Sequence, residues 1–299
     1  MTSGGNIDLA IDVEKIQMTQ VMDDRGQRYA GVSNYRIGQG RRALEDLVSG
    51  ATQWRLWLMF GWLDIRQRYR RAVIGPFWIT ISMLVMVISL GVIYSSLFKI
   101  EIDTFIPFLT AGFSIWFFIS ATITDATMMY ISAEGIIRNA TLPLSIHIFR
   151  LLWRNLLIYA HNVVVMLPVY VWFRLNPGFE VLLVIPGLIL VLLNLSWMTL
   201  VVATLCARFR DTPPIVSNIL QIFFFVTPIL YRPNLLSTKL SLLIDLNPIS
   251  HVIEVVRAPM LGSIPSLLSY LLMILFAVVG WAIAFICHRR YRSSIAYWL

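Results

Sequence analysis

Long apolar runs alternate with short polar segments from residue 72 to the C-terminus. Most runs hold about 20 or more residues with almost no charge, the length that an α-helix needs to cross a bilayer. The pattern predicts an all-α integral membrane protein with six transmembrane helices. We expect them at Ala72–Phe98, Thr104–Thr124, Leu151–Phe173, Val181–Ala207, Pro213–Tyr231 and Ile264–Cys287.

The first fifty residues differ from the rest because they are polar and mixed in charge. They contain no apolar core of a signal peptide, so we expect no cleaved leader. We predict that residues 1–50 form a cytoplasmic tail, flexible over residues 1–36 and carrying a short surface helix from Gly40 onward.

Residues 51–71 form a second unit, an aromatic helix followed by a basic border. Trp54, Trp57 and Trp62 share this segment with several charged side chains. Tryptophan is enriched at the membrane surface, which favours an amphipathic helix lying in that plane. The alternative is that the segment is only the start of the first span. With the in-plane helix as a separate unit, we expect residues 72–299 to form the six-helix membrane domain.

Charge sets the expected orientation. The chain is 58% hydrophobic, only 13% charged and carries a net charge of +8. Cationic side chains cluster at one end of the apolar runs, first at Arg66, Arg68, Arg70 and Arg71. By the positive-inside rule this end faces the cytoplasm, and both termini are expected there. Topology explains the arginines better than nucleic-acid binding does, because they form no single stripe.

Two connecting segments are long enough to have structure of their own. Residues 133–150 join the second and third spans on the predicted cytoplasmic side. Residues 232–265 lie outside and contain two short semi-apolar stretches separated by Asn247 and Pro248. Neither stretch is long enough to span, so we predict a pair of re-entrant helices.

Motifs for catalysis are missing from the sequence. The lysines are Lys15, Lys99 and Lys239, and none belongs to the glycine-rich loop of a Walker A motif. Zinc-hydrolase and nucleophile-elbow motifs are also absent. We expect no enzyme activity, no metal and no cofactor of its own for this chain.

Polar and aromatic side chains inside the spans are the remaining candidates for a path. Asn155, Tyr159 and Asn162 are spaced to share one helix face. Trp116 and Phe117 belong to an aromatic run in the second span, and aromatic faces suit sugar rings. The alternatives are that the polar groups bond neighbouring helices and that the aromatic rings only pack.

Three segments carry a resemblance to a known family. They are DIRQRYRRAVIGPFW at Asp64–Trp78, AEGIIRNATLPLSIHIFRLLWRNLLIYAHN at Ala133–Asn162, and NPISHVIEVVRAPMLG at Asn247–Gly262. Together they resemble the permease subunit of bacterial polysaccharide-export ABC transporters, which move undecaprenyl-linked O-antigen, capsule or teichoic acid. The similarity extends over about residues 40–299.

The resemblance implies a homodimer in the bacterial inner membrane, bound to two copies of a cytoplasmic ATPase that holds ATP and magnesium. It implies that residues 133–150 contain the coupling helix that contacts this ATPase. The residues expected there are Glu134, Arg138, Leu142 and Pro143. A lipid-linked glycan would enter near Arg66, Arg68, Arg70 and Arg71, whose guanidinium groups suit a pyrophosphate, although topology alone also explains them. It would pass Trp116, Phe117, Tyr159 and Asn162.

Other functions remain open at this stage. Within transport, a capsule or teichoic acid exporter, or a drug or lipid exporter of the same architecture, is the nearest competitor. A membrane-embedded glycosyltransferase would need grouped acidic residues at the surface, whereas Asp64, Asp125 and Asp211 are on different segments. A structural membrane protein would bind partners without altering the turnover of an ATPase.

Overall fold

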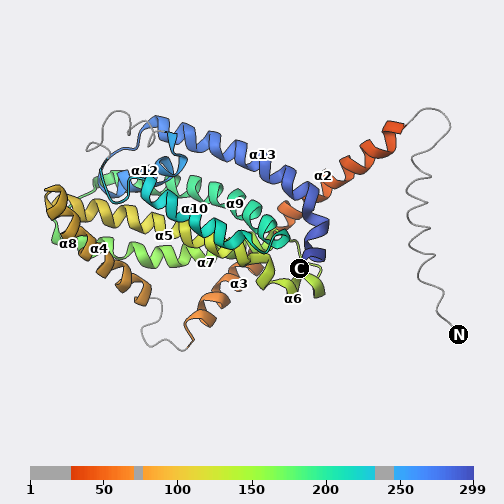
Figure 1. The fold of residues 1–299 in the computed structure, drawn as a ribbon, viewed down its shortest axis with the longest axis horizontal. Helices are drawn as coiled ribbons and strands as arrows, with labels where there is room; N and C mark the ends of the chain where they lie inside the picture. The colour runs from red at the N-terminus through yellow and green to blue at the C-terminus, as the bar shows by residue number, and fades with distance from the viewer. Residues whose placement is uncertain (1–27, 71–76, 233–245) are drawn as a thin grey trace.

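The computed structural model describes residues 28–70, 77–232 and 246–299, and within these residues all regular structure is helical. Figure 1 shows a bundle of long helices, with α3, α6 and the C-terminus at one end and α8 and α12 at the other. We call these the α6 end and the α12 end. The helices are α2 (Arg28–Thr52), α3 (Trp54–Arg68), α4 (Phe77–Phe98), α5 (Ile102–Ser132), α6 (Glu134–Asn139), α7 (Ile146–Val163), α8 (Met166–Trp172), the 3-10 helix η1 (Gly178–Leu183), α9 (Val184–Arg208), α10 (Thr212–Val226), α12 (Pro248–Met260) and α13 (Leu267–Trp298).

Helix α5 is the centre of the bundle. It packs against α4, α7, α9, α10 and α12. Its side chains are buried along most of the stretch from Phe105 to Tyr130. The other long helices expose apolar side chains on their outer faces, as expected where lipid rather than water is the solvent.

Five helical segments of the described chain are long and apolar enough to cross a membrane. They are Phe77–Leu97, Ile102–Ser132, Ile146–Trp172, Gly178–Arg208 and Leu267–Trp298. These segments correspond to five of the six predicted spans and confirm an all-helical protein with several apolar helices. Residues 72–76, predicted to begin the first span, lie outside the described residues.

The predicted fifth span is shorter in the structure than in the prediction. Helix α10 has 15 residues, which corresponds to a rise of about 22 Å, against a hydrocarbon core of about 30 Å. It ends at Val226, two residues before Pro228, since a proline disfavours helical backbone in the residue before it. The count of six spans therefore stays a prediction.

The direction of α10 is nevertheless clear from its neighbours. Just before α10, Arg208 lies over the rings of Tyr291 and Trp298 near the C-terminus. Just after it, Asn247 Nδ2 donates to Thr227 Oγ1 at 2.9 Å, beside the start of α12. The chain thus passes from the α6 end to the α12 end along α10.

The N-terminal segment corrects one prediction. Residues 1–27 lie outside the described residues, but α2 begins at Arg28, well before Gly40, so residues 28–36 are helical rather than a flexible tail. The last turns of α2 pack on the bundle through buried Ala43 and Asp46. Once these turns are fixed, each further residue adds one hydrogen bond without a new nucleation cost, which lets a polar helix extend outward.

Of the predicted re-entrant pair, only the second helix falls within the described residues. It is α12, which Asn247 caps by accepting a hydrogen bond from the backbone N–H of Ile249. The first stretch is LLSTKLSLLIDL at residues 235–246, and all of it except Leu246 lies outside the described residues. Arg257 fixes α12 to the bundle, because its Nη1 donates to the carbonyl of Pro228 at 2.6 Å and its guanidinium lies 4.2 Å from the ring centre of Phe108.

Candidate functional site

The segment after α6 is held to the bundle by one buried carboxylate, Asp46 of α2. The backbone N–H groups of Leu144 and Ser145 donate to its two oxygens, each at 3.1 Å. From α13, Arg292 Nε donates at 3.0 Å and His288 Nε2 lies at 3.2 Å. We call this group, Asp46 with Leu144, Ser145, His288 and Arg292, the Asp46 clasp.

Local geometry explains why α2 approaches so closely. The Ser145 hydroxyl donates to the backbone carbonyl of Asp46 at 2.6 Å. Gly50, one turn further along α2, faces the same segment, and a Cβ atom there would collide with Ser145 Oγ. A glycine at this position therefore permits the contact that joins α2 to the loop.

The charge of Asp46 is stabilised despite its burial. Burial alone would raise the pKa of this carboxyl group, but hydrogen bonds and positive charge from His288 and Arg292 outweigh it and lower the pKa to about 2. Asp46 therefore remains ionised at neutral pH and can accept all four contacts. The clasp joins three parts of the chain: α2, the segment before α7, and the end of α13.

The clasp leaves the predicted coupling residues at the surface. Glu134 and Arg138 form an exposed ion pair at 3.1 Å along α6. Leu142 and Pro143 line an open groove of about 470 Å³, together with Arg42, Asp46, Ser49 and Arg292 among others. The structure thus presents all four residues at the α6 end, where a partner could reach them.

A second polar group connects α3, α5 and α7. Arg150 Nε donates to Asp64 Oδ2 at 2.8 Å, and Arg154 Nη2 donates to Asp125 Oδ2 at 2.6 Å. Arg68 Nη2 lies 3.8 Å from Asp125 Oδ1, a longer ion pair. These five residues, Asp64, Arg68, Asp125, Arg150 and Arg154, form what we call the arginine cluster.

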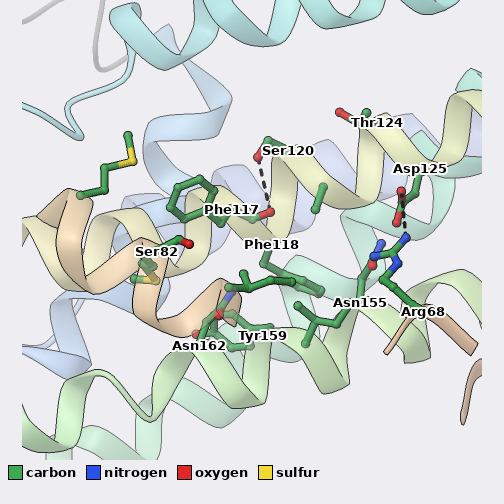
Figure 2. A pocket seen from close by; sticks show the side chains of 15 residues that line it. Arg68, Ser82, Phe117, Phe118, Ser120, Thr124, Asp125, Asn155, Tyr159 and Asn162 are labelled. Atoms are coloured by element: carbon green, nitrogen blue, oxygen red, sulfur yellow. Dashed lines mark hydrogen bonds and ion pairs between the residues drawn. The ribbon is translucent and has the colours of Figure 1, made fainter. Parts of the chain in front are cut away.

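The arginine cluster adjoins a cavity that is more enclosed than the groove at Leu142 and Pro143. This cavity of about 460 Å³ lies between α4, α5 and α7, with Arg68 of α3 at one end. Figure 2 shows Arg68, Asp125 and Asn155 together at that end, with Ser82 and Asn162 nearer the other. We call it the α4–α7 cavity. Its lining residues are Arg68, Ile79, Ser82, Met83, Met86, Phe117, Phe118, Ser120, Ala121, Thr124, Asp125, Asn155, Ile158, Tyr159 and Asn162.

Some predicted site residues meet in this cavity and others do not. Arg68, Phe117, Tyr159 and Asn162 all line it. Trp116 does not, because it is buried against α10, with its ring centre 5.7 Å from that of Phe224. Arg66 and Arg70 are exposed near Arg68 in sequence without lining the cavity, and Arg71 lies outside the described residues.

Comparison with known proteins decides the family. The model of the ABC-2 type transporter family matches residues 55–261, more than half of the chain. The chain belongs to the ABC-2 type transporter family. It is therefore a multi-pass inner-membrane protein and the permease of an ABC transporter.

Relatives within this ABC-2 family carry a more specific name. The chain is 24% identical over 198 residues to the "O-antigen export system permease protein RfbA" of Klebsiella pneumoniae, covering 64% of this chain and 74% of that protein. It is 23% identical over 188 residues to a protein of the same name in Myxococcus xanthus, covering 62% and 72%. The resemblance inferred from the three sequence segments is confirmed.

Sequence reasoning missed most of the residues that the two polar groups use. Asp46 and its partners His288 and Arg292 lie outside the part that the ABC-2 model matches. One signal was available: acidic residues are rare in this chain, so an aspartate bordering an apolar run, such as Asp64 or Asp125, indicates a buried partner.

Proposed function

We propose that this ABC-2 permease exports a lipid-linked polysaccharide of the O-antigen type across the inner membrane. It would act as a homodimer with two copies of a separate ATPase, which would hold the ATP and magnesium. The observation that supports this substrate is the name of its relatives in two organisms, O-antigen export system permease. ABC-2 permeases require an ATPase partner, and the exposed coupling residues at the α6 end supply a surface for it.

Charge supports placing the α6 end in the cytoplasm. Arginines of α2, α3, α7 and α13 gather toward it, among them Arg42, Arg150 and Arg292. Both α2 and the end of α13 meet there in the Asp46 clasp, so the two ends of the described chain share one side. An even number of crossings satisfies this, and α10 would supply the sixth.

The proposed mechanism transmits force through the clasp. Closure of the ATPase would push on Glu134, Arg138, Leu142 and Pro143. The Asp46 clasp would pass this movement to α7 and α13, because its hydrogen bonds join the three segments at 3.0–3.2 Å. The arginine cluster would pass it to α3 and α5. A path for the glycan would then open between the two copies.

Entry of the substrate is proposed at the basic end of α3. Arg66, Arg68 and Arg70 are exposed there, and guanidinium groups bind phosphate oxygens through paired hydrogen bonds. A reconstituted transporter carrying Arg66→Gln and Arg70→Gln should export less polymer at the same ATPase rate. Normal export by this variant, with correct membrane orientation, would remove the phosphate role.

Deletion of the chain tests the proposed function as a whole. In the source bacterium, loss of this permease should trap undecaprenyl-linked polymer in the cytoplasm and remove it from the cell surface. Extraction of lipid-linked glycans and surface staining measure the two pools, and the wild-type chain should restore both. A deletion strain with unchanged surface polymer would contradict the substrate assignment. Accumulation of a drug or of a free lipid instead would favour the other exporters.

A further inference from the structure

The α4–α7 cavity has a charged end at Arg68 and Asp125, and the rest of its lining is apolar or uncharged, including Ser82 and Asn162. Ile79, Met83, Met86, Phe117 and Ile158 supply apolar wall. Arg68, Asp125 and Asn155 lie at one end, as Figure 2 shows. A cavity of about 460 Å³ falls within the range of about 300–1,000 Å³ typical of small-molecule sites. This division fits an amphiphile, with a polar head at the α3 end and an apolar chain along α4 and α7.

Asn155 is the observation that points to a ligand. Only 2% of the residue is exposed, and neither its amide nitrogen nor its amide oxygen has a hydrogen-bond partner among the described residues. Burying an amide without partners is costly, and native proteins rarely leave one so. Asn162, one of the other lining residues of α7, is paired instead, since its Oδ1 accepts from Thr80 Oγ1 at 3.4 Å. The amide of Asn155 can therefore donate to an occupant of the cavity.

Arg68 is the second group available to such a ligand. Its side chain is 44% exposed, and within the described part of the chain its one ion pair is the long one to Asp125. Asp125 already has a closer partner, Arg154 at 2.6 Å. In the arginine cluster three guanidinium groups face two carboxylates, which leaves one positive charge in excess. An anionic head group would complement the positive charge at the Arg68 end of the cavity. The apolar walls disfavour a free, fully hydrated anion.

We propose that the α4–α7 cavity binds a lipid with a phosphate-bearing head, one per chain. The phosphate lies between Arg68 and the Asn155 amide, and the first part of the chain lies against Met83, Met86 and Ile158. This site lies within one protomer and is distinct from the proposed glycan path between the two copies. It does not depend on what polymer is exported. Two lipids share the required chemistry, an anionic membrane phospholipid and a polyprenyl phosphate.

Thermal unfolding of the purified full-length chain in maltoside micelles tests this site, because such micelles contain no phosphate. The 10 tryptophans report unfolding. Three probes are added separately: phosphatidylglycerol, undecaprenyl phosphate, and a glucosyl diacylglycerol without phosphate. A lipid that binds the folded chain alone raises the melting temperature with its concentration, which gives an apparent Kd.

The wild type should be stabilised by one or both phosphate lipids and much less by the glucosyl lipid. Asn155→Leu and Arg68→Gln should each weaken the response at least about tenfold, since each removes a hydrogen bond to a charged group. Arg55→Gln is the matched control: it lies on the same helix, is exposed and does not line the cavity. It should leave the apparent Kd unchanged.

A second variant keeps the test valid if either polar variant folds poorly. Ala121→Phe places a ring in the cavity from its rim and leaves the polar end intact. It should also abolish the response. A phosphatidylglycerol with a photoreactive group in its acyl chain should label peptides of α4 and α7 in the wild type and not in Ala121→Phe.

The probes also separate the two sources. Stabilisation by phosphatidylglycerol alone identifies a bilayer phospholipid, and stabilisation by undecaprenyl phosphate alone identifies a polyprenyl carrier lipid; both support the site. Equal stabilisation by the glucosyl lipid, or an equal response from wild type and Asn155→Leu, would overturn it. If wild type and Asn155→Leu respond equally, Asn155→Leu should also have the higher melting temperature in the absence of lipid, because the buried amide would then bind no ligand.

Discussion

The two polar groups near the α6 end are built differently. In the Asp46 clasp, a carboxylate that is 1% exposed has hydrogen-bond contacts on both oxygens. In the arginine cluster, the aspartates are partly exposed, the cluster borders the α4–α7 cavity, and the ion pairs range from short contacts to the 3.8 Å separation at Arg68. The carboxylate of the clasp has contacts on both oxygens, whereas the cluster has a cation, Arg68, that can change partner.

This difference assigns the two groups different tasks. A fully satisfied buried carboxylate holds its surroundings in one arrangement, because breaking any contact leaves a charge without a partner. A partly exposed cluster loses less when one pair opens, because water replaces the lost partner. We therefore expect the clasp to transmit force rigidly and the cluster to rearrange when α3 moves or a ligand enters.

Asp46→Ala should have the largest effect. It removes one partner of a buried ionic network and leaves His288 and two backbone N–H groups unpaired, which costs about 3–5 kcal/mol. Unfolding of the purified chain, followed by tryptophan fluorescence, measures the loss. Glu45→Gln is the matched control, because Glu45 is exposed on the same helix and forms an exposed ion pair with Arg41; it should change stability by less than about 1 kcal/mol. Similar losses for both variants would contradict the structural role of the Asp46 carboxylate.

Arg154→Gln should have the second largest effect and lower the free energy of unfolding by about 1.5–3 kcal/mol, the range for hydrogen bonds to charged groups. Arg154 donates to Asp125 and also lies 3.5 Å from Asp64, so it joins α7 to both α5 and α3. The same unfolding measurement applies. Partial solvation of the cluster should keep the loss below that of Asp46→Ala, and a larger loss would reverse the ranking of the two groups.

Acid should weaken the clasp at a pH that the pKa of Asp46 defines. Because the folded pKa is about 2 and the ordinary value is 3.8, the clasp stabilises the fold fully above about pH 4. Its contribution, about 2 kcal/mol, disappears as the pH falls through 2. Limited digestion by pepsin, which is active in this range, would follow release of α2. Asp46→Asn should remove this step, and a step that persists in that variant would assign it to another group.

Arg68→Gln should have the smallest effect on stability, about 0–1 kcal/mol, because its ion pair is long and nearly half exposed. Its effect on lipid binding should nevertheless be large. Stability and lipid affinity should be measured on one preparation. If Arg68 binds a ligand but does not stabilise the fold, the variant loses lipid affinity and keeps its stability. A loss of stability as large as that of Arg154→Gln would show that Arg68 is structural.

Much of the bundle could be predicted from the sequence because apolar length is a local property. The spans at α4, α5, α7 and α9 follow from runs of uncharged residues, and the shared face of Asn155, Tyr159 and Asn162 follows from helical spacing. The part of α2 from Gly40 onward was predicted as a short surface helix, but its first part, residues 28–39, was missed because it is polar. The end of α2 is held by contacts with segments far along the chain.

The partners of buried side chains could not be predicted, because they lie far apart in the sequence. Asp46 and Arg292 are 246 positions apart, and no local pattern pairs them. Trp116 and Phe117 are neighbours in sequence, but successive residues point in different directions around a helix, so only one of them faces the cavity. The choice depends on how α10 packs against α5, which spacing alone does not specify.

The central claim is that a separate ATPase drives this permease through the segment that Asp46 clasps. Its most direct test is the rate of ATP hydrolysis in proteoliposomes that contain this chain alone, the partner ATPase alone, or both, with Asp46→Ala as the fourth sample. The account predicts no hydrolysis by this chain alone, a changed ATPase rate when both are present, and loss of that change in Asp46→Ala. Hydrolysis by the purified chain without a partner, or a rate that the chain does not alter, would contradict it.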